Sequence, residues 1–536
     1  MKYKNKIIGT LLTGMFMTGL SSCDFLDTLP YDFVAPETFY KDENDCNMAL
    51  AGVYWTLATE NVYGENYSCK LSNTDDLSFY TRSNQSDNVA VNSHGTGNTQ
   101  IWKAWVELYR GINNANVLIE NIDKAKFSDE SAKNRILGEA KFLRAYYHFL
   151  LVQGWYEVPI RKESVNEITK SPIAATSHTE ALDWIIDEME STLDMVDDEA
   201  YDMSPSHVKK TVVQGILARV CLWRAAFLNE GEDAKPFYTK ASKYAKAVKD
   251  SGKHKLIATD GKPENIYLLW QNMATDNYDK TYNESMWEVE FIGNRADGRW
   301  SESKIGSSIG NQQLNSSLEG KGYGYAFYAG SLLLWDLLNE DPNDLRRDLS
   351  LAPYTYDKDD KKKEMSDKKL IRYCGKYRRE WETLTPKQKN NTPCNYCILR
   401  YADVLLMLAE AENEINNRPT ELALEAINEV RKRANVSEYA DMNYDAFKTE
   451  LQKERARELC FESVRKFDLI RWGIYYTQIK NELGKMVTED GRWGSGTLQI
   501  APSQFVANTN QNHIFLPIPM RELSVNTLLN QNKYWK

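Results

Sequence analysis

Apolar side chains recur at intervals of three and four residues along several long segments, and this spacing restricts the possible folds more than any other feature of the chain. One stripe covers residues 101–119, and a second covers residues 136–150. Because this spacing places side chains on one face of an α-helix, the two stripes predict a pair of packed helices. Ser128 lies in the intervening turn and is the expected N-cap of the second helix.

The same pattern returns later in the chain. Ser177 and Glu180 form a capping-box sequence, which predicts another helix start. Further helices are expected at residues 210–228, 237–252, 401–415 and 423–434. Helix pairs that recur in this way are typical of tetratricopeptide-like repeats, which stack into scaffolds with concave surfaces. The sequence therefore predicts a mainly α fold built from helical hairpins.

Residues 256–400 differ from this pattern, since they are rich in Tyr, Trp, Gly, Asn and Ser. Residues 284–293 (ESMWEVEFIG) alternate in the manner of a short strand, and residues 320–330 (GKGYGYAFYAG) read as a Gly/Tyr loop. A long irregular insertion on a rigid scaffold is a common place for a binding site.

The N-terminus predicts export. Three lysines precede a short apolar run at residues 7–20, and Leu-Ser-Ser-Cys follows, ending at Cys23. A membrane-spanning helix needs about 20 apolar residues, so this run is too short to span. The layout is typical of a lipoprotein signal peptide over residues 1–22, with Cys23 as the lipid attachment site. An ordinary signal peptide followed by a chance cysteine is the alternative.

Charge and cysteine content narrow the possible functions. The net formal charge is −10, and an acidic exported chain is a poor candidate for binding nucleic acid, which relies on basic patches. Seven cysteines remain after Cys23, so at least one is unpaired in the monomer. Cys394 and Cys397 form a CxxC sequence near Cys374, but no second CxxC completes a zinc site. A local disulfide, a metal site and free thiols all remain open for this pair.

Known catalytic and metal-binding motifs are missing from the sequence. It contains no Walker A loop, H-E-x-x-H sequence or G-x-S-x-G elbow. The run around Asp357 and Asp359 resembles a calcium loop, but lysines (Lys362 and Lys368) occupy the positions of the required Gly and Glu. We interpret it as a solvated charge run, and we expect no metal and no cofactor.

Residues 454–473 form a charged helical segment near the C-terminus. Glu454, Glu458 and Glu462 repeat every four residues beside several arginines. Buried charges of this kind must be paired, so we interpret them as structural. A catalytic pair of carboxylates is the alternative interpretation.

Several segments together resemble one known family. They are residues 105–122 (WVELYRGINNANVLIENI), 138–160 (GEAKFLRAYYHFLLVQGWYEVPI), 399–417 (LRYADVLLMLAEAENEINN), 423–434 (ALEAINEVRKRA) and 454–473 (ERARELCFESVRKFDLIRWG). The start of the mature chain (CDFLDTLP) and the closing HIFLPIPMREL follow the same order. The chain resembles the SusD/RagB family of outer-membrane nutrient-binding lipoproteins.

The resemblance implies a SusD-like α/α fold with four tetratricopeptide-like units in a single domain, residues 23–536. Its helical scaffold would cover about 35–255 and 399–475, and a variable ligand-binding insertion would cover about 256–398. It also implies a lipid-anchored protein on the outer face of the outer membrane, without catalysis. Such a protein would capture oligosaccharides for a SusC-like TonB-dependent transporter. A peptide-binding RagB-type protein, a surface glycoside hydrolase and a lid that relies on its transporter for ligand contacts are the alternatives.

Candidate ligand residues follow from the chemistry of sugars, whose apolar faces pack on aromatic rings while polar side chains bind their rims. Aromatic residues in helical stripes, such as Trp105 and Trp223, are expected in the core, and Trp287 is excluded because it lies on the expected strand. The candidates off the periodic segments are Asp75, Asp76, Tyr80, Arg82, Trp270, Asn272, Trp300, Tyr323, Tyr325 and Tyr328.

Overall fold

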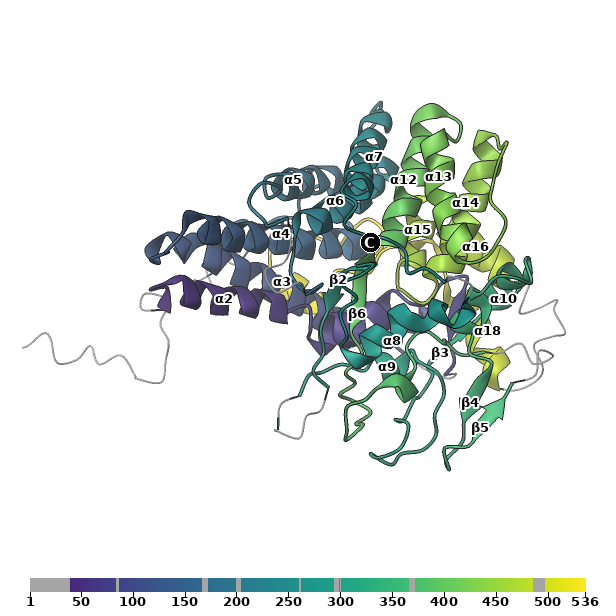
Figure 1. Cartoon of the computed structure of the whole chain (residues 1–536). Coiled ribbons are helices and arrows are strands. Elements are labelled where there is room, and N and C mark those ends of the chain that lie inside the picture. The colour runs from purple at the N-terminus through teal and green to yellow at the C-terminus, as the bar shows by residue number, and fades with distance from the viewer. Residues whose placement is uncertain are drawn as a thin grey trace, which may run out of the picture.

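Consecutive helices pack side by side from the N-terminal arm to the C-terminal region (Figure 1). The computed structural model describes residues 39–82, 86–165, 172–198, 204–259, 262–293, 298, 300–365, 372–484 and 497–536. The expected signal peptide and Cys23 lie outside the described residues. The scaffold helices are α2 (Glu43–Trp55), α3 (Thr99–Asn121), α4 (Glu130–Trp155), α5 (His178–Glu190), α6 (Lys210–Ala226), α7 (Lys235–Asp250), α12 (Tyr401–Asn416), α13 (Glu421–Arg433), α14 (Tyr444–Leu459), α15 (Arg465–Arg471) and α16 (Tyr475–Gln478).

The predicted stripes are confirmed as the buried faces of these helices. Helix α3 buries Ile101, Leu108 and Ile112 and packs on both α2 and α4. Helix α4 is buried all round in its second half, because α2, α3 and α5 surround it. The mainly α architecture of packed helical hairpins expected from the sequence is therefore present.

Two local expectations at helix ends need correction. Asp129, not Ser128, caps α4: its carboxylate accepts the Ser131 backbone N–H at 2.9 Å. Ser177 precedes α5, but its hydroxyl is directed at the Glu180 carboxylate (3.4 Å) and caps no backbone N–H. A carboxylate carries more negative charge than a hydroxyl, so it is the better acceptor at a helix N-terminus.

The charged C-terminal segment is two helices, α14 and α15, and not the one helix expected. Phe461 and Ser463, which lie between them, both have left-handed backbone angles (φ 64° and 60°). Such angles end an α-helix. The break lets α15 change direction and bring its own arginines against the core.

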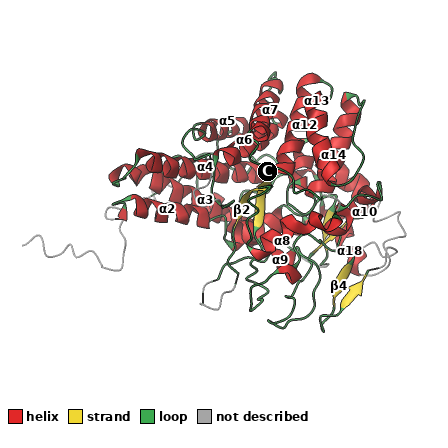
Figure 2. Ribbon diagram, in the orientation of Figure 1, coloured by secondary structure: helices red, strands yellow, loops and turns green. Residues whose placement is uncertain are grey.

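The insertion below the helices consists of loops, short helices and strand pairs (Figure 2). Its short helices and those of the C-terminal tail are α8 (Leu268–Thr275), α9 (Ile305–Ser308), α10 (Leu332–Asn339), α11 (Arg346–Ser350), α18 (Thr497–Asn508) and α19 (Met520–Val525). The 3₁₀ and π turns are Glu60–Gly64, Asn66–Leu71, Val89–Val91, Ile122–Lys124, Pro263–Tyr267, Arg379–Trp381, Ile479–Leu483 and Gln511–Ile514. The antiparallel strand pairs are β1 (Ser78–Tyr80) with β3 (Tyr328–Gly330), β2 (Ser285–Val289) with β6 (Tyr396–Arg400), and β4 (Tyr354–Tyr356) with β5 (Lys362–Glu364).

Two of these strand pairs bear on the sequence predictions. The expected strand at 284–293 is confirmed as β2, and Trp287 is fully buried there. The segment at 320–330 is not a loop throughout, because its last residues form β3 and pair with β1 some 250 residues earlier in the chain. The N-terminal segment and the insertion are thereby joined.

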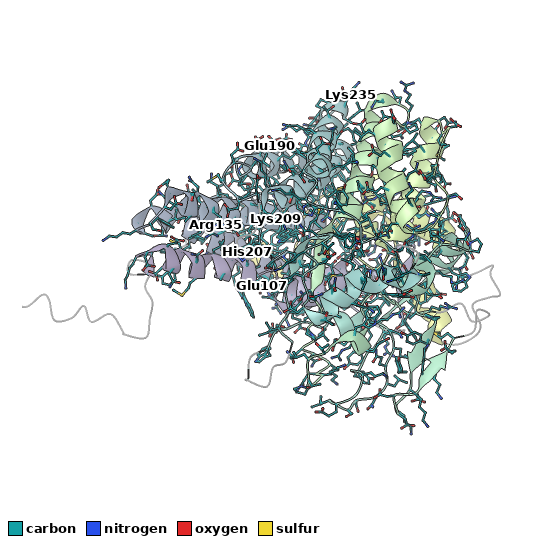
Figure 3. All side chains as sticks on the ribbon, in the orientation of Figure 1. Glu107, Arg135, Glu190, His207, Lys209 and Lys235 are labelled. Atoms are coloured by element: carbon teal, nitrogen blue, oxygen red, sulfur yellow. The ribbon has the colours of Figure 1, made fainter. Side chains whose placement is uncertain are left out.

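Polar contacts join the helices of the arm, where Figure 3 labels Arg135, Glu190 and His207. Glu139 on α4 accepts from Arg135 at 2.9 Å and from the Tyr54 hydroxyl of α2 at 2.5 Å, and it contacts His207 at 3.3 Å. Glu190 on α5 accepts from two side chains of α7 in the same way. These contacts fix helix positions, since a buried carboxylate is stable only where donors meet it.

The cysteines of the described chain carry no disulfide. Cys46, Cys69, Cys221, Cys374, Cys394, Cys397 and Cys460 are buried thiols. Burial raises the pKa of the Cys221 thiol to about 12, so it stays protonated and unreactive. The CxxC pair therefore consists of two free thiols. Within the described residues, no helix has both the length and the apolar character to cross a bilayer.

Candidate functional site

A half-exposed row of aromatic side chains lies where the N-terminal segment meets the insertion. The chain from Gly324 to Gly330 is held on both of its edges. On one edge, Tyr325 N–H and Phe327 N–H donate to the carbonyls of Ser307 (2.7 Å) and Ser308 (2.8 Å), the last two residues of α9. On the other, Thr81 N–H donates to the Phe327 carbonyl at 2.7 Å. This double attachment fixes the direction of each side chain.

Aromatic and small residues alternate in this segment, although it is not a regular strand, since Ala326 has a left-handed backbone angle (φ 49°). Tyr323, Tyr325 and Phe327 are partly exposed, whereas Gly324 and Ala326 between them are buried. A Cβ atom on Gly324 would approach the Asn311 carbonyl oxygen to 2.4 Å, so glycine is required there. The small residues let the strand lie against the core while the rings point outward.

We call Tyr80, Tyr323, Tyr325 and Phe327 the aromatic ridge. Tyr325 and Phe327 stack with ring centroids 4.8 Å apart and planes within 9°. Tyr323 meets the Tyr325 ring edge-on at 4.9 Å, and Tyr80 from β1 lies 5.6 Å from Phe327. The arrangement is a continuous aromatic surface supplied by two distant parts of the sequence.

A depression of about 380 Å³ lies beside the ridge. This volume is within the range of small-ligand sites, about 300–1,000 Å³. Its remaining lining is polar: Glu65, Lys70, Ser86, Asp87, Asn88, Gln100, Lys304, Ser308 and Asn390. Among the described residues, the Gln100 side-chain carbonyl is buried without a hydrogen-bond partner. The depression thus offers aromatic surface, amides and charged groups in one place.

The floor of the depression is a closed ion cluster. Glu65 accepts from Lys70 at 2.9 Å, from Lys304 at 3.4 Å and from the Ser308 hydroxyl at 3.0 Å. Burial acts to raise the pKa of Glu65, but the two ammonium groups and the hydrogen bonds hold it below its usual value. Glu65 is therefore an ionised structural group and not a proton donor for catalysis.

The structure brings four of the candidate residues together. Tyr80, Tyr323 and Tyr325 belong to the ridge, and Arg82 stands over it with its guanidinium 5.3 Å from the Phe327 centroid. Phe327 was missed by the sequence reasoning, although the spacing of Tyr323, Tyr325 and Phe327 at every second residue signals a shared face. Lys389, Asn88, Gln100 and Asn390 were missed because nothing in their local sequence marks them.

Asp75 and Asp76 lie inside the protein. Asp76 forms a two-pronged ion pair with Arg465 of α15, at 2.9 and 2.8 Å. Asp75 accepts the backbone N–H groups of Leu77 and Ser78 at 2.8 and 2.9 Å. Burial and the adjacent Asp76 raise the pKa of Asp75 to about 7. Both carboxylates hold the segment that leads into β1, and neither faces the depression.

The other four candidates do not form part of the exposed ridge surface. Trp270, expected in a loop, is a buried residue of α8 and packs edge-on against Tyr377 at 5.1 Å. Tyr328 is also buried, and its hydroxyl donates to the Cys69 carbonyl at 2.7 Å. Asn272 borders a second depression of about 190 Å³ between α6, α8 and β2. Trp300 is 52% exposed in the insertion.

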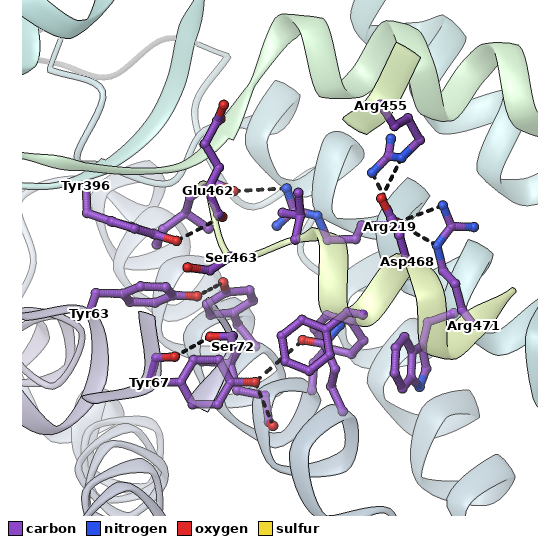
Figure 4. A pocket seen from close by; sticks show the side chains of 18 residues that line it. Tyr63, Tyr67, Ser72, Arg219, Tyr396, Arg455, Glu462, Ser463, Asp468 and Arg471 are labelled. Carbon is purple, nitrogen blue, oxygen red and sulfur yellow. Dashed lines mark hydrogen bonds and ion pairs between the residues drawn. The ribbon is translucent and has the colours of Figure 1, made fainter. Parts of the chain in front are cut away.

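A separate internal cavity lies where α15 meets α4 and α6 (Figure 4). Tyrosines such as Tyr63 and Tyr67 face an ion cluster in which Arg455 donates to Asp468 at 2.7 Å and to Asp403 at 2.8 Å. Although burial acts to raise it, the pKa of Asp403 stays far below its usual value, because Arg455 and Arg219 contact the carboxylate. The cavity holds only about 50 Å³, which is too little for a sugar.

The three glutamates of the charged segment are buried and paired with cations. Glu454 accepts from Arg346 at 2.6 Å, Glu458 from Arg400 at 2.6 Å, and Glu462 from Arg400 at 2.7 Å. Burial acts to raise the pKa of Glu458, but its surrounding guanidinium groups hold it well below the usual value. Glu458 therefore stays ionised and cannot serve as a general acid near neutral pH, and the ion pairs of all three glutamates favour the structural interpretation.

The calcium-like run is the turn of the β4–β5 hairpin. Asp357 accepts the backbone N–H groups of Asp359 and Lys361 at 2.9 Å each and pairs with Lys363 at 3.2 Å. Its carboxylate is thus used within the turn. In the described part of the chain, no cluster of His, Cys, Asp and Glu is suited to hold a metal ion.

Comparisons with known proteins agree with this architecture. The family model described as "SusD family" matches residues 351–535, and that described as "Starch-binding associating with outer membrane" matches residues 24–222. SusD-like protein P25 of Formosa agariphila is 25% identical over 99% of this chain and 98% of its own length. The crystal structure of a SusD homolog from Bacteroides thetaiotaomicron has a TM-score of 0.80 at 25% identity, covering 93% of this chain and 98% of that chain.

A further solved structure, titled as a laminarin-binding SusD-like protein, shares the fold with a TM-score of 0.67 at 20% identity, over 92% of this chain and all of the other. The two family models match the N-terminal and C-terminal parts of the scaffold, and the relative and the structures extend the similarity across the insertion. The chain belongs to the SusD/RagB family.

Proposed function

We propose that this chain is a lipoprotein of the outer cell surface that captures oligosaccharides on the aromatic ridge and delivers them to a SusC-like TonB-dependent transporter. The observation that carries the proposal is the ridge itself, a rigid and half-exposed aromatic surface beside a polar depression. Sugar rings have apolar C–H faces and hydroxyl rims, so they need aromatic surface and hydrogen-bonding groups together.

The residues around the ridge supply both kinds of contact. Asn88, Gln100 and Asn390 bring amide groups to the lining of the depression. Arg82 adds donors at the rim. Because the backbone bonds of the ridge are already formed, a ligand meets a prepared surface and little ordering energy is lost on binding.

The cellular setting follows from family membership and from the N-terminus. One matching family model is described as associating with the outer membrane, which supports this location. Lipidation at Cys23 after removal of residues 1–22 would anchor the mature domain, residues 23–536. Delivery to a transporter is the role expected of a non-catalytic capture protein in this setting.

Capture without cleavage is the favoured activity. A glycoside hydrolase needs one carboxylic acid with a raised pKa and a second carboxylate across the scissile bond. Glu65 at the floor of the depression instead has a lowered pKa and two lysine partners. Glu65 is therefore ionised and cannot act as the carboxylic acid that hydrolysis requires.

The test is a binding screen on the mature chain (residues 24–536), using native gels that contain single polysaccharides, followed by calorimetry with oligosaccharides. Tyr325→Ala should weaken binding of the retained glycan at least tenfold, about 1.4 kcal/mol, because it removes the centre of the ridge. Trp55→Ala is the matched control, since Trp55 is a 53% exposed aromatic on α2, away from the ridge. Its affinity should stay within twofold of the wild type.

Three results would count against the proposal. New reducing ends in the glycan incubation would indicate a hydrolase. Heat of binding from a peptide panel, together with no retardation by any glycan, would indicate the peptide-binding branch of the family. Equal affinities for Tyr325→Ala and the wild type would place the ligand elsewhere, with the depression beside Asn272 as the next surface to examine.

A further inference from the structure

Two cationic side chains stand directly over the stacked pair of the aromatic ridge. The guanidinium carbon of Arg82 is 5.3 Å from the Phe327 centroid, and its Nη2 lies 3.5 Å from the Tyr325 carbonyl oxygen. The ammonium of Lys389 is 5.7 Å from the Tyr325 centroid. Because Tyr325 and Phe327 are stacked, the two charges flank one continuous surface.

These two cations differ from the others around the depression. Lys70 and Lys304 share the carboxylate of Glu65, and Lys304 also pairs with Glu60 at 2.6 Å. Within the described ranges, by contrast, neither Arg82 nor Lys389 forms an ion pair with a carboxylate. Their charge is therefore available to an incoming group.

The nearby acidic groups do not neutralise them. Glu60 and Glu65 are engaged by the two floor lysines, and the exposed Asp87, which accepts from the neutral Asn98 amide at 3.0 Å and keeps its charge, leaves one carboxylate of the lining against the two cations of the ridge. The surroundings of the ridge thus keep an excess of positive charge on a chain whose net formal charge is −10. Charges beyond about 8–10 Å are largely screened at physiological ionic strength, so these local cations decide which ligand is favoured.

We propose that the aromatic ridge selects acidic oligosaccharides, whose uronate carboxylates or sulfate esters contact Arg82 and Lys389 while their sugar rings pack on Tyr325 and its neighbours. This inference rests on the proposed function, because it names the substrate class of the same site. Arg presents paired N–H donors that match the two oxygens of a carboxylate or sulfate group. The row of aromatic rings and the amide-lined depression favour repeated sugar units over an acidic peptide.

The test compares each acidic polysaccharide with its neutral counterpart on the same backbone. Polygalacturonate against its methyl ester probes carboxylates, and dextran sulfate against dextran probes sulfate esters; the panel of neutral glycans from the binding screen is run alongside. The wild type should bind the acidic member of at least one pair tenfold or more tightly at about 50 mM salt, and added salt should reduce this preference. The pair that responds identifies the anionic group.

Variants then assign the preference to the two cations. Arg82→Gln with Lys389→Gln should reduce the acidic-over-neutral preference to within twofold. Lys243→Gln with Arg418→Gln is the matched control, because it removes one exposed lysine on α7 and one exposed arginine just after α12, two elements that contribute no residue to the ridge or the depression. Thermal denaturation of the wild type and the two double variants checks that folding is unchanged.

Three outcomes overturn the inference, and they can be told apart. If a neutral glycan binds as tightly as any acidic one, or if only neutral glycans bind, capture stands and the acidic preference fails. If the preference persists in the Arg82/Lys389 double variant, other groups create it and the assignment fails. If no glycan in either set binds, the proposed function fails together with this inference.

Discussion

Glu288 provides a sharp test of the structure because it is a carboxylate enclosed in the insertion. It lies on β2 with 6% of its surface exposed, and it accepts the Asn395 amide at 3.1 Å. Burial raises its pKa from 4.5 to about 7; hydrogen bonds from Ser285 and Asn395 oppose this rise, and the charges of Glu290 and Asp276 add to it. The side chain is therefore protonated in the folded protein at pH 5 and ionised at pH 9.

The sign of the pH effect follows from linkage. The folded pKa is raised, so the stability contributed by neutral Glu288 is present below pH 4.5 and is lost as the pH rises through 7. At 1.36 kcal/mol per pH unit, the loss is at most about 3 kcal/mol. Glu288→Gln keeps the shape and the acceptor for Asn395 but cannot ionise, so it avoids this loss. For a chain of ~500 residues, ~3 kcal/mol corresponds to about 3 °C in Tm.

The assay is thermal denaturation of the wild type and Glu288→Gln at pH 5 and pH 9. The two proteins should unfold within about 1 °C of each other at pH 5, and the variant should be about 3 °C more stable at pH 9. Glu264→Gln, which removes an exposed carboxylate of the same insertion, should show no such difference. Equal offsets at the two pH values, or a variant less stable at pH 9, would refute the buried and unpaired state of Glu288.

Three further predictions concern other parts of the chain. Asp76→Ala leaves the Arg465 guanidinium buried without its carboxylate and should lower the free energy of unfolding by about 3–5 kcal/mol in denaturation experiments; a loss under about 1 kcal/mol would contradict the pairing. Burial holds the pKa of His148 at about 3. The free energy of unfolding of the wild type should therefore fall by up to ~3 kcal/mol between pH 6.5 and 4.5, because the unfolded state takes up a proton there. His148→Gln should flatten that part of the stability curve, and parallel curves would rule out this assignment. Cys23→Ala should move the protein from the membrane fraction to the soluble fraction; retention in cells without the transporter would exclude the lipid anchor.

The helical scaffold could be predicted because its signals are local. The apolar stripes at residues 101–119 and 136–150 show which face of each helix is buried. This can be read from the sequence because residues on one helix face are only three or four positions apart. The capping residues at helix ends were harder to predict from the sequence. Ser128 and Asp129 are both acceptable caps in sequence, and only the direction of the incoming chain decides between them.

The binding surface was predicted only in part because its contacts are distant in sequence. Asp75 and Asp76 lie in a polar stretch typical of a surface loop, yet Arg465, 389 residues away from Asp76, draws the segment inward. The pairing of β1 with β3 likewise joins Tyr80 to a segment near residue 328 that no local pattern connects with it. Tyr323 and Tyr325 were predicted because their residue type alone marks them as candidates, without knowledge of the residues that they contact.

The positively charged side chains discussed above fall into two groups with different roles. In the scaffold, Arg400 and Arg455 are each buried between carboxylates, so their charge is neutralised inside and fixes how helices and strands meet. At the ridge, Arg82 and Lys389 lie on aromatic rings in contact with solvent, where a carboxylate partner would cancel the attraction that they exert on a ligand. A surface that attracts an anionic ligand must leave its cations without carboxylate partners. An unpaired cation costs little free energy only where water still solvates it. The half-exposed position of the ridge satisfies both conditions, which is why we place selection of the ligand there and not in the more strongly charged interior.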